Sequence, residues 1–207
     1  MRQVKTRTVA VAAAVLLAGA GVGMGHGEPP AAVGTAPKDA PVTGLRLLES
    51  MCGEFDVTYT AYPRPGAEPM TIKATAVREM ILGGKILQQR IEATEGPMPF
   101  STMIHTAYNA GAKGGGRFEV NRMSSMGSCM MPERGTFDPE TRTFNLEGSH
   151  EINGMTGTCR VVHRLLDDGK ESADVYLGFE GFSEEFKGMT VPEYKAMVVE
   201  YARKRAK

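Results

Sequence analysis

The stretch from residue 143 to residue 163, TFNLEGSHEINGMTGTCRVVH, contains the clearest indication of the fold. Apolar Phe144 and Leu146 alternate with polar residues upstream of the Asn153-Gly154 pair, and a second strand-like segment follows that pair. A period of two is typical of a β-strand with one buried face, and Asn-Gly between two strands favours a two-residue hairpin turn. We therefore expect an antiparallel hairpin in which Ile152 pairs with Met155.

The same alternation recurs along the rest of the chain, over residues 55–61, 70–76, 102–108, 118–123, 175–179 and 196–201. Gly83-Gly84 marks another hairpin turn, and residues 44–51 predict one short helix. The last alternating segment also fits a helix, because Pro192 and Glu193 precede it. Many short strands joined by tight turns favour a sheet that removes its edges by closing. We expect an all-β fold, a closed antiparallel barrel of about 8–10 strands, over residues 44–205.

The first 25 residues have the pattern of a cleavable signal peptide. Arg2, Lys5 and Arg7 precede an apolar run over residues 9–21, which is shorter than the roughly 20 residues of a membrane-spanning helix. Residues 26–43 are rich in Pro, Ala and Gly and predict a disordered linker. We expect an exported protein, periplasmic or extracellular, that touches the membrane only through this transient segment. The alternative is an uncleaved leader that tethers the domain to the inner membrane.

Composition and motifs exclude several classes of function. Without the leader, 21 Lys and Arg stand against 24 Asp and Glu, a net charge of −3, whereas a nucleic-acid-binding protein would show a basic stripe. The sequence contains no Gly-x-Ser-x-Gly elbow, zinc-protease helix or phosphate-binding loop. It therefore favours a protein that is not an enzyme and does not bind nucleic acid. It does not indicate an oligomeric state.

The three cysteines are an odd number for an exported chain. If the Asp-Pro-Glu-Thr segment forms a four-residue turn, Phe137 pairs with Arg142. Extending both hairpin registers places Cys129 and Cys159 on strands that flank one central strand, about 9–10 Å apart. A disulfide needs roughly 4.4–6.8 Å between the Cα atoms. We expect no disulfide between these two residues, while a bond from Cys52 to one of them stays open.

Strand parity predicts which side chains point into the barrel. The apolar face that carries Phe144 and Leu146 should point inward. The side chains opposite this face on the neighbouring strands should then point inward too. We expect a small apolar ligand to bind residues of this interior, namely Phe144, Leu146, Val161, His163 and Met131. Sulfur and imidazole groups on the same face suit copper(I) or the axial position of a haem. The alternative to a site without cofactor is thus a copper or haem site formed by Cys129, His150, Cys159 and His163. A packed interior without any ligand satisfies the same pattern.

Four blocks of the chain resemble, in order and spacing, the domain of unknown function 1579 family. They are residues 48–53, residues 78–100 (REMILGGK, LQQ and GPMPF), residues 135–143 (GTFDP and TRT) and residues 201–204 (YARK). Members of that family usually have Trp where this chain has Phe55, and Trp-x-Asp where it has Arg122-Met123-Ser124. The resemblance implies an exported, calycin-like or lipocalin-like β-barrel, and it implies no activity.

Three functions agree with these expectations. The first is a non-catalytic barrel that binds a small apolar ligand in its interior. The second is copper or haem binding through the interior Cys, Met and His side chains. The third is a structural or interaction module of the cell envelope, which an exposed apolar patch would favour.

Overall fold

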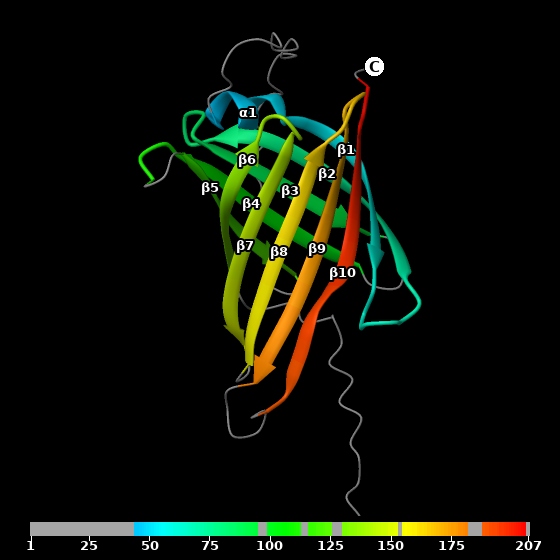
Figure 1. Cartoon of the computed structure of the whole chain (residues 1–207). Coiled ribbons are helices and arrows are strands. Elements are labelled where there is room, and N and C mark those ends of the chain that lie inside the picture. Colours follow the sequence, from blue (N-terminus) through cyan, green and yellow to red (C-terminus); the bar gives the residue numbers. More distant parts are fainter. Residues whose placement is uncertain are drawn as a thin grey trace, which may run out of the picture.

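In the computed structural model, strands of the described residues close into a ten-stranded antiparallel barrel preceded by one short helix (Figure 1). The structure describes residues 44–94, 99–112, 116–125, 130–152, 155–181 and 188–205. The predicted signal peptide (1–25) and linker (26–43) lie outside the described residues. The elements are α1 (Gly44–Ser50), β1 (Gly53–Ala61), β2 (Met70–Ile81), β3 (Ile86–Ala93), β4 (Phe100–Asn109), β5 (Arg117–Ser124), β6 (Met131–Asp138), β7 (Thr143–Ile152), β8 (Met155–Leu165), β9 (Lys170–Gly181) and β10 (Thr190–Arg203).

Each strand pairs with the next one along the chain, and β10 pairs back onto β1. In that last pair, Tyr59 lies opposite Val199. Closure gives the first and last strands hydrogen-bonded neighbours on both sides, so neither remains an open edge. The all-β closed barrel predicted from the sequence is therefore confirmed, and the final segment that fits either a helix or a strand is the strand β10.

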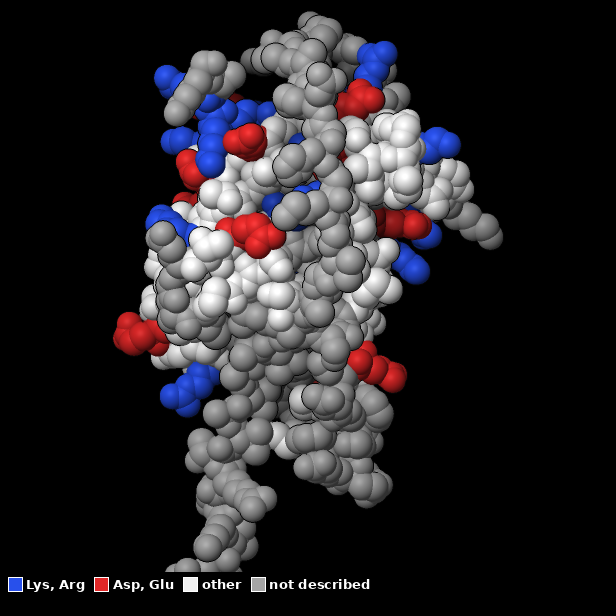
Figure 2. Space-filling model, turned by 180° about the vertical axis from the view of Figure 1, so that it is seen from behind, with Lys and Arg blue, Asp and Glu red and all other residues white. Residues whose placement is uncertain are grey.

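Alternation along the strands determines which side chains form the core. On β1, Phe55, Val57 and Tyr59 are at most 6% exposed, while Glu54 and Asp56, which alternate with them, lie on the outer surface. Successive strand residues point to opposite faces of the sheet, so each strand supplies an apolar row to one common interior. On the outside, Lys and Arg side chains are interspersed with Asp and Glu over the face shown in Figure 2.

The hairpin of β7 and β8 has the predicted register. Ile152 pairs with Met155, and Phe144 pairs with His163 further along the two strands. The face that the sequence predicts to point inward does so, because Phe144 and Leu146 are 3% and 6% exposed.

The predicted register of β6 against β7 is wrong by two residues. Phe137 pairs with Phe144 and not with Arg142. The reason is local: Asp138 is the last residue of β6, and its carboxylate accepts a hydrogen bond of 2.7 Å from the hydroxyl of Thr141. The turn therefore starts after Asp138 and includes Arg142, which adopts a left-handed conformation with φ 53°. An error of two residues leaves the inward face unchanged, since side chains alternate with a period of two.

The turn between β2 and β3 lies at the predicted place but is longer than a two-residue turn. Ile81 pairs with Ile86, so four residues connect the strands. Leu82, Gly83 and Gly84 have φ of 50°, 67° and 77°. Glycine adopts this conformation without a Cβ penalty, while Leu82 takes it at the exposed tip of the hairpin.

Helix α1 covers one end of the barrel (Figure 1). Its buried side chains include Leu47 and Leu48, which are 7% and 0% exposed. Gly44 packs so closely on the ring of Tyr108 that a Cβ at this position would overlap the ring. At the other end of the helix, the guanidinium of Arg203 donates hydrogen bonds to the carbonyls of Ser50 and Cys52. A cation at a helix C-terminus is favourable, and here it attaches α1 to the end of β10.

Candidate functional site

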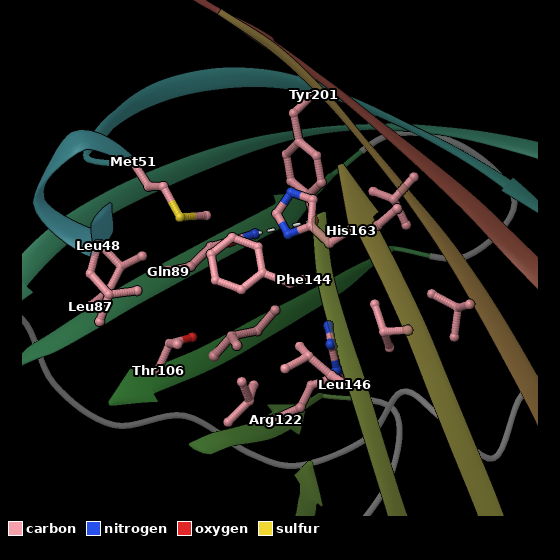
Figure 3. Close-up of a pocket in the computed structure, with 16 residues that line it drawn as sticks. Leu48, Met51, Leu87, Gln89, Thr106, Arg122, Phe144, Leu146, His163 and Tyr201 are labelled. Carbon is pink, nitrogen blue, oxygen red and sulfur yellow. Dashed lines mark hydrogen bonds between the residues drawn. The ribbon is translucent and has the colours of Figure 1, made fainter. Parts of the chain in front are cut away.

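A cavity of about 60 Å³ lies inside the barrel beneath α1 (Figure 3). Helix α1 and seven strands line it, and each of these strands contributes two side chains that are two positions apart, as strand alternation requires. The lining side chains are Leu48, Met51, Leu87, Gln89, Ile104, Thr106, Val120, Arg122, Phe144, Leu146, Val161, His163, Ala173, Val175, Val199 and Tyr201. Benzene binds an apolar protein cavity of about 150 Å³. By that ratio, this cavity accepts about two or three non-hydrogen atoms.

The wall of the cavity is mainly apolar. Five of its sixteen side chains are polar: Gln89, Thr106, Arg122, His163 and Tyr201. Pockets that bind small molecules typically combine an apolar lining with a few placed polar groups. The arrangement therefore suits a small apolar molecule or an apolar end group that carries one polar atom.

Four of the five residues predicted to bind a ligand meet at this cavity. Phe144, Leu146, Val161 and His163 all line it. Met131 points into the barrel and is 5% exposed, but it does not line the cavity.

A buried charge network joins the cavity wall to β2 and β9. Arg78 Nη1 donates to both carboxylate oxygens of Glu171 at 2.6 and 2.8 Å, and His163 Nε2 lies 2.7 Å from Glu171 Oε2. Arg78 Nε donates to Gln89, whose side-chain amide donates to the hydroxyl of Tyr201. Burial raises the pKa of the Glu171 carboxyl, but Arg78 and His163 outweigh burial and lower it to about 2. Glu171 is therefore ionised at neutral pH and can only accept hydrogen bonds.

Arg78 is the most enclosed charge of this network. Its side chain is 0% exposed, and its guanidinium carbon lies 4.4 and 4.7 Å from the ring centres of Phe55 and Tyr201. Its Nη2 atom is buried without a hydrogen-bond partner among the described residues. The two aromatic rings supply the favourable contact that this edge of the guanidinium lacks in hydrogen bonds.

A second ion pair, between the half-buried Arg122 and the buried Glu133, lies beside the thiol of Cys159. Arg122 Nε and Nη2 donate to the two oxygens of Glu133, which is 1% exposed. Cys159 Sγ lies 3.8 Å from Glu133 Oε1. Burial, followed by the Glu133 charge, raises the pKa of Cys159 to about 12, so the thiol is protonated at neutral pH. Cys52 and Cys159 are free thiols. Cys129 lies outside the described residues, so the absence of a bond between Cys129 and Cys159 stays a prediction.

The residues of the alternative metal site do not gather in the described part of the chain. Cys159 and His163 are four positions apart on β8, about 13 Å along the strand, and His163 is bonded to Glu171. His150 is half-buried and packs beside Gly157 on β8. Among the described residues, no group of three or more His, Cys, Asp or Glu side chains is placed to hold a metal ion. The copper and haem alternatives, which include Cys129, stay predictions.

The segment that forms the barrel, its short helix and its cavity matches a known protein family. A family model described as "Protein of unknown function (DUF1579)" matches residues 41–200. The chain belongs to the DUF1579 family. A comparison with curated proteins finds no match. Every residue that lines the cavity of this DUF1579 barrel, except Tyr201, falls within the matched segment. Among the described residues, no helix has the length and apolar character needed to cross a membrane.

Sequence reasoning did not identify the charged and amide groups of the DUF1579 interior. Arg78, Gln89, Glu133 and Glu171 are all less than 9% exposed. Charged residues usually face solvent, so the sequence pattern alone does not indicate that these side chains are buried. Strand alternation could have identified Glu171. It lies four residues before the inward-facing Val175 on β9, and strand residues an even number of positions apart point to the same face.

Proposed function

We propose that this DUF1579 domain is a non-catalytic barrel that binds a small, mainly apolar ligand in the cavity beneath α1. The supporting observation is the cavity itself, which α1 and seven strands line and whose wall is apolar at eleven of sixteen side chains. Barrels of this size leave interior room for one small ligand, and apolar concave sites with few polar groups are typical of ligand binding.

The size of the cavity limits the ligand. Its volume of about 60 Å³ is well below the roughly 300–1,000 Å³ of pockets that hold drug-sized molecules. The ligand, or the part of it inside the barrel, has about two or three non-hydrogen atoms at this volume. A larger ligand requires part of the wall to move, for example Leu48 of α1 or Met51 just after it.

The buried carboxylates support binding rather than catalysis. Glu171 is held by Arg78 and His163, and Glu133 is held by Arg122. A general acid or base needs a pKa near the working pH, whereas the pKa of Glu171 is lowered to about 2. Arg78 and His163 therefore keep Glu171 ionised, and Glu133 has Arg122 as its structural partner.

We further propose that the domain is exported, on the basis of the leader over residues 1–25. The mass of the protein recovered from the producing cells tests this proposal. A mature chain that starts near residue 26 in the periplasm or medium is the expected result. A full-length chain in the membrane fraction supports the tethered alternative, and a full-length chain in the cytoplasm contradicts export.

Propane, with three non-hydrogen atoms, is a probe of suitable size for the cavity. We expect it to shift the NMR signals of methyl groups that line the cavity, such as those of Leu146 and Val161. Its dissociation constant should be no lower than about 0.5 mM, since the best ligands gain at most about 1.5 kcal/mol per non-hydrogen atom. Ala173→Leu fills the cavity and should abolish the shifts. Ala196→Leu is the matched control, because Ala196 is equally buried but does not line the cavity. Wild-type methyl signals that do not respond, or that respond only outside the cavity, contradict the proposal.

A further inference from the structure

His163 differs from the other polar side chains of the cavity in how firmly it is held. Its ring projects into the cavity between Phe144 and Tyr201, with centroid distances of 5.7 and 5.9 Å (Figure 3). Its Nε2 atom lies 2.7 Å from Glu171, which Arg78 fixes from the other side. The two aromatic rings and the carboxylate thus determine both the position and the rotation of the imidazole.

The charge state of Glu171 decides which imidazole nitrogen carries the proton. Because the pKa of Glu171 is lowered to about 2, its carboxylate has no proton to donate. The contact of 2.7 Å is therefore a hydrogen bond that His163 Nε2–H donates. In the neutral imidazole, Nδ1 then carries a lone pair and is a hydrogen-bond acceptor. No described residue makes a hydrogen bond to Nδ1, and the ring that carries it lines the cavity.

We propose that His163 is the polar anchor of the cavity: its Nδ1 accepts a hydrogen bond from a hydroxyl or N–H group of the ligand. This inference rests on the proposed function, and it adds the chemical class of the ligand. The ligand is a small neutral molecule, or the end of a longer one, in which a hydrogen-bond donor is attached to an apolar body, with about two or three non-hydrogen atoms in all.

Arg122 and Tyr201, two other polar side chains of the cavity wall, would bind a different chemical group of a ligand. Arg122 can only donate, and its partner Glu133 neutralises its charge at 3.2 Å. The hydroxyl of Tyr201 accepts from Gln89, which leaves its proton free to donate. An anchor at Arg122 or Tyr201 would therefore select a ligand with a hydrogen-bond acceptor, while an anchor at His163 selects a donor. The two kinds of anchor can therefore be distinguished by whether the protein prefers a ligand with a hydrogen-bond donor or one with an acceptor.

Three probes of equal size distinguish these anchors: propane has neither group, dimethyl ether has only an acceptor, and ethanol has a donor. We expect ethanol to bind about fivefold more tightly than the other two, which corresponds to one net hydrogen bond. The readout is the NMR shift of the cavity methyl groups. If the three bind equally, the cavity is a binding site but His163 is not its anchor. If dimethyl ether binds as well as ethanol and better than propane, the anchor is a donor such as Arg122. If none binds, the proposed function itself fails.

The variant His163→Phe keeps an aromatic ring between Phe144 and Tyr201 but removes the acceptor. We expect propane still to bind and the preference for ethanol to disappear. His150→Phe is the matched control, since His150 also points inward but does not line the cavity, and it should keep the preference. A preference for ethanol that survives in His163→Phe overturns the proposal.

A measurement on the wild-type protein keeps the proposal testable if His163→Phe does not fold. The ¹⁵N shifts of the two ring nitrogens distinguish a protonated from an unprotonated nitrogen. We expect Nε2 to be protonated, Nδ1 to be unprotonated, and ethanol but not propane to change the Nδ1 shift. A protonated Nδ1 in the neutral ring, or an Nδ1 signal that ethanol does not change, contradicts the inference.

Discussion

At the scale of single residues, the carboxylate of Glu171 is the buried group that both Arg78 and His163 contact. It is 6% exposed and holds Arg78, whose side chain is completely buried. The substitution Glu171→Gln should destabilise the fold by about 3–5 kcal/mol, because it leaves the guanidinium of Arg78 buried without a counter-charge. Denaturant unfolding followed by circular dichroism measures the change.

Glu119→Gln provides the matched control for that experiment. Glu119 also pairs with an arginine, Arg117, at 2.8 Å, but both side chains lie on the surface and are about 40% exposed. Solvent and salt screen such a pair, so its loss should change stability little. If the two substitutions destabilise the protein equally, burial of the Arg78 pair is not the cause.

The same carboxyl makes the stability depend on pH. Arg78 and His163 overcome the effect of burial and lower the pKa of Glu171 from its ordinary 4.5 to about 2. A lowered pKa in the folded state stabilises the protein above pH 4.5, and this contribution is lost as the pH falls towards 2. The shift corresponds to about 3 kcal/mol. We expect the stability gap between wild type and Glu171→Gln to narrow by this amount between pH 5 and pH 2. A gap that stays constant over this range would show that the pKa of Glu171 is the same in the folded and the unfolded protein.

At the scale of the elements, the sequence predicts strands better than it predicts turns. Each strand repeats its period over several residues, so its inward face is defined several times. The pairing of β6 with β7 depends on one turn, where the bond from Thr141 to Asp138 moves the register by two residues. The inward position of Val161 and His163 was predictable because the β7–β8 hairpin has the predicted register. That of Met131 on β6 was predictable because parity is insensitive to the two-residue error.

The contacts of the polar side chains in the site were less predictable from the sequence than the inward direction of the apolar ones. The direction of Arg122 follows from its place two residues after Val120, but its partner does not. Glu133 reaches it from β6, through a pairing between strands that the sequence pattern alone leaves undefined. Which charges meet inside a barrel depends on the stagger of neighbouring strands, and stagger is set by turn geometry.

Helix α1 closes the cavity through Leu48, which is 0% exposed. Leu48→Ala should cost about 2–5 kcal/mol and enlarge the cavity. We therefore expect this variant to bind benzene, which is too large for the wild-type cavity. Calorimetry in the presence of benzene measures the effect as a rise in the melting temperature.

Leu177→Ala is the control for the enlarged cavity. Leu177 is 1% exposed and does not line the cavity, so its truncation should destabilise the fold by a similar amount without creating benzene binding at the α1 end. Equal benzene effects on the methyl signals around Leu146 in both variants would mean that α1 does not form the cavity wall.

At the scale of the whole molecule, the barrel depends on the contact between the two ends of the domain. Strand β10 pairs with β9 on one side and with β1 on the other, across about 140 residues of sequence. It also contributes Val199 and Tyr201 to the cavity. Removing β10 would open two strand edges and expose one side of the core, and open edges promote association with other chains.

A chain that ends at Gly181 should therefore fail to fold cooperatively and should self-associate. A peptide of residues 190–205 added in trans should restore the folded barrel, because it supplies the missing pairings to β1 and β9. The same peptide with Val199→Asp should not, since Val199 is 3% exposed in the core. Size-exclusion chromatography and the spread of methyl NMR signals follow both reactions. If the truncated chain alone is monomeric and unfolds cooperatively, the barrel is stable as an open sheet, and closure by β10 is not what holds the fold together.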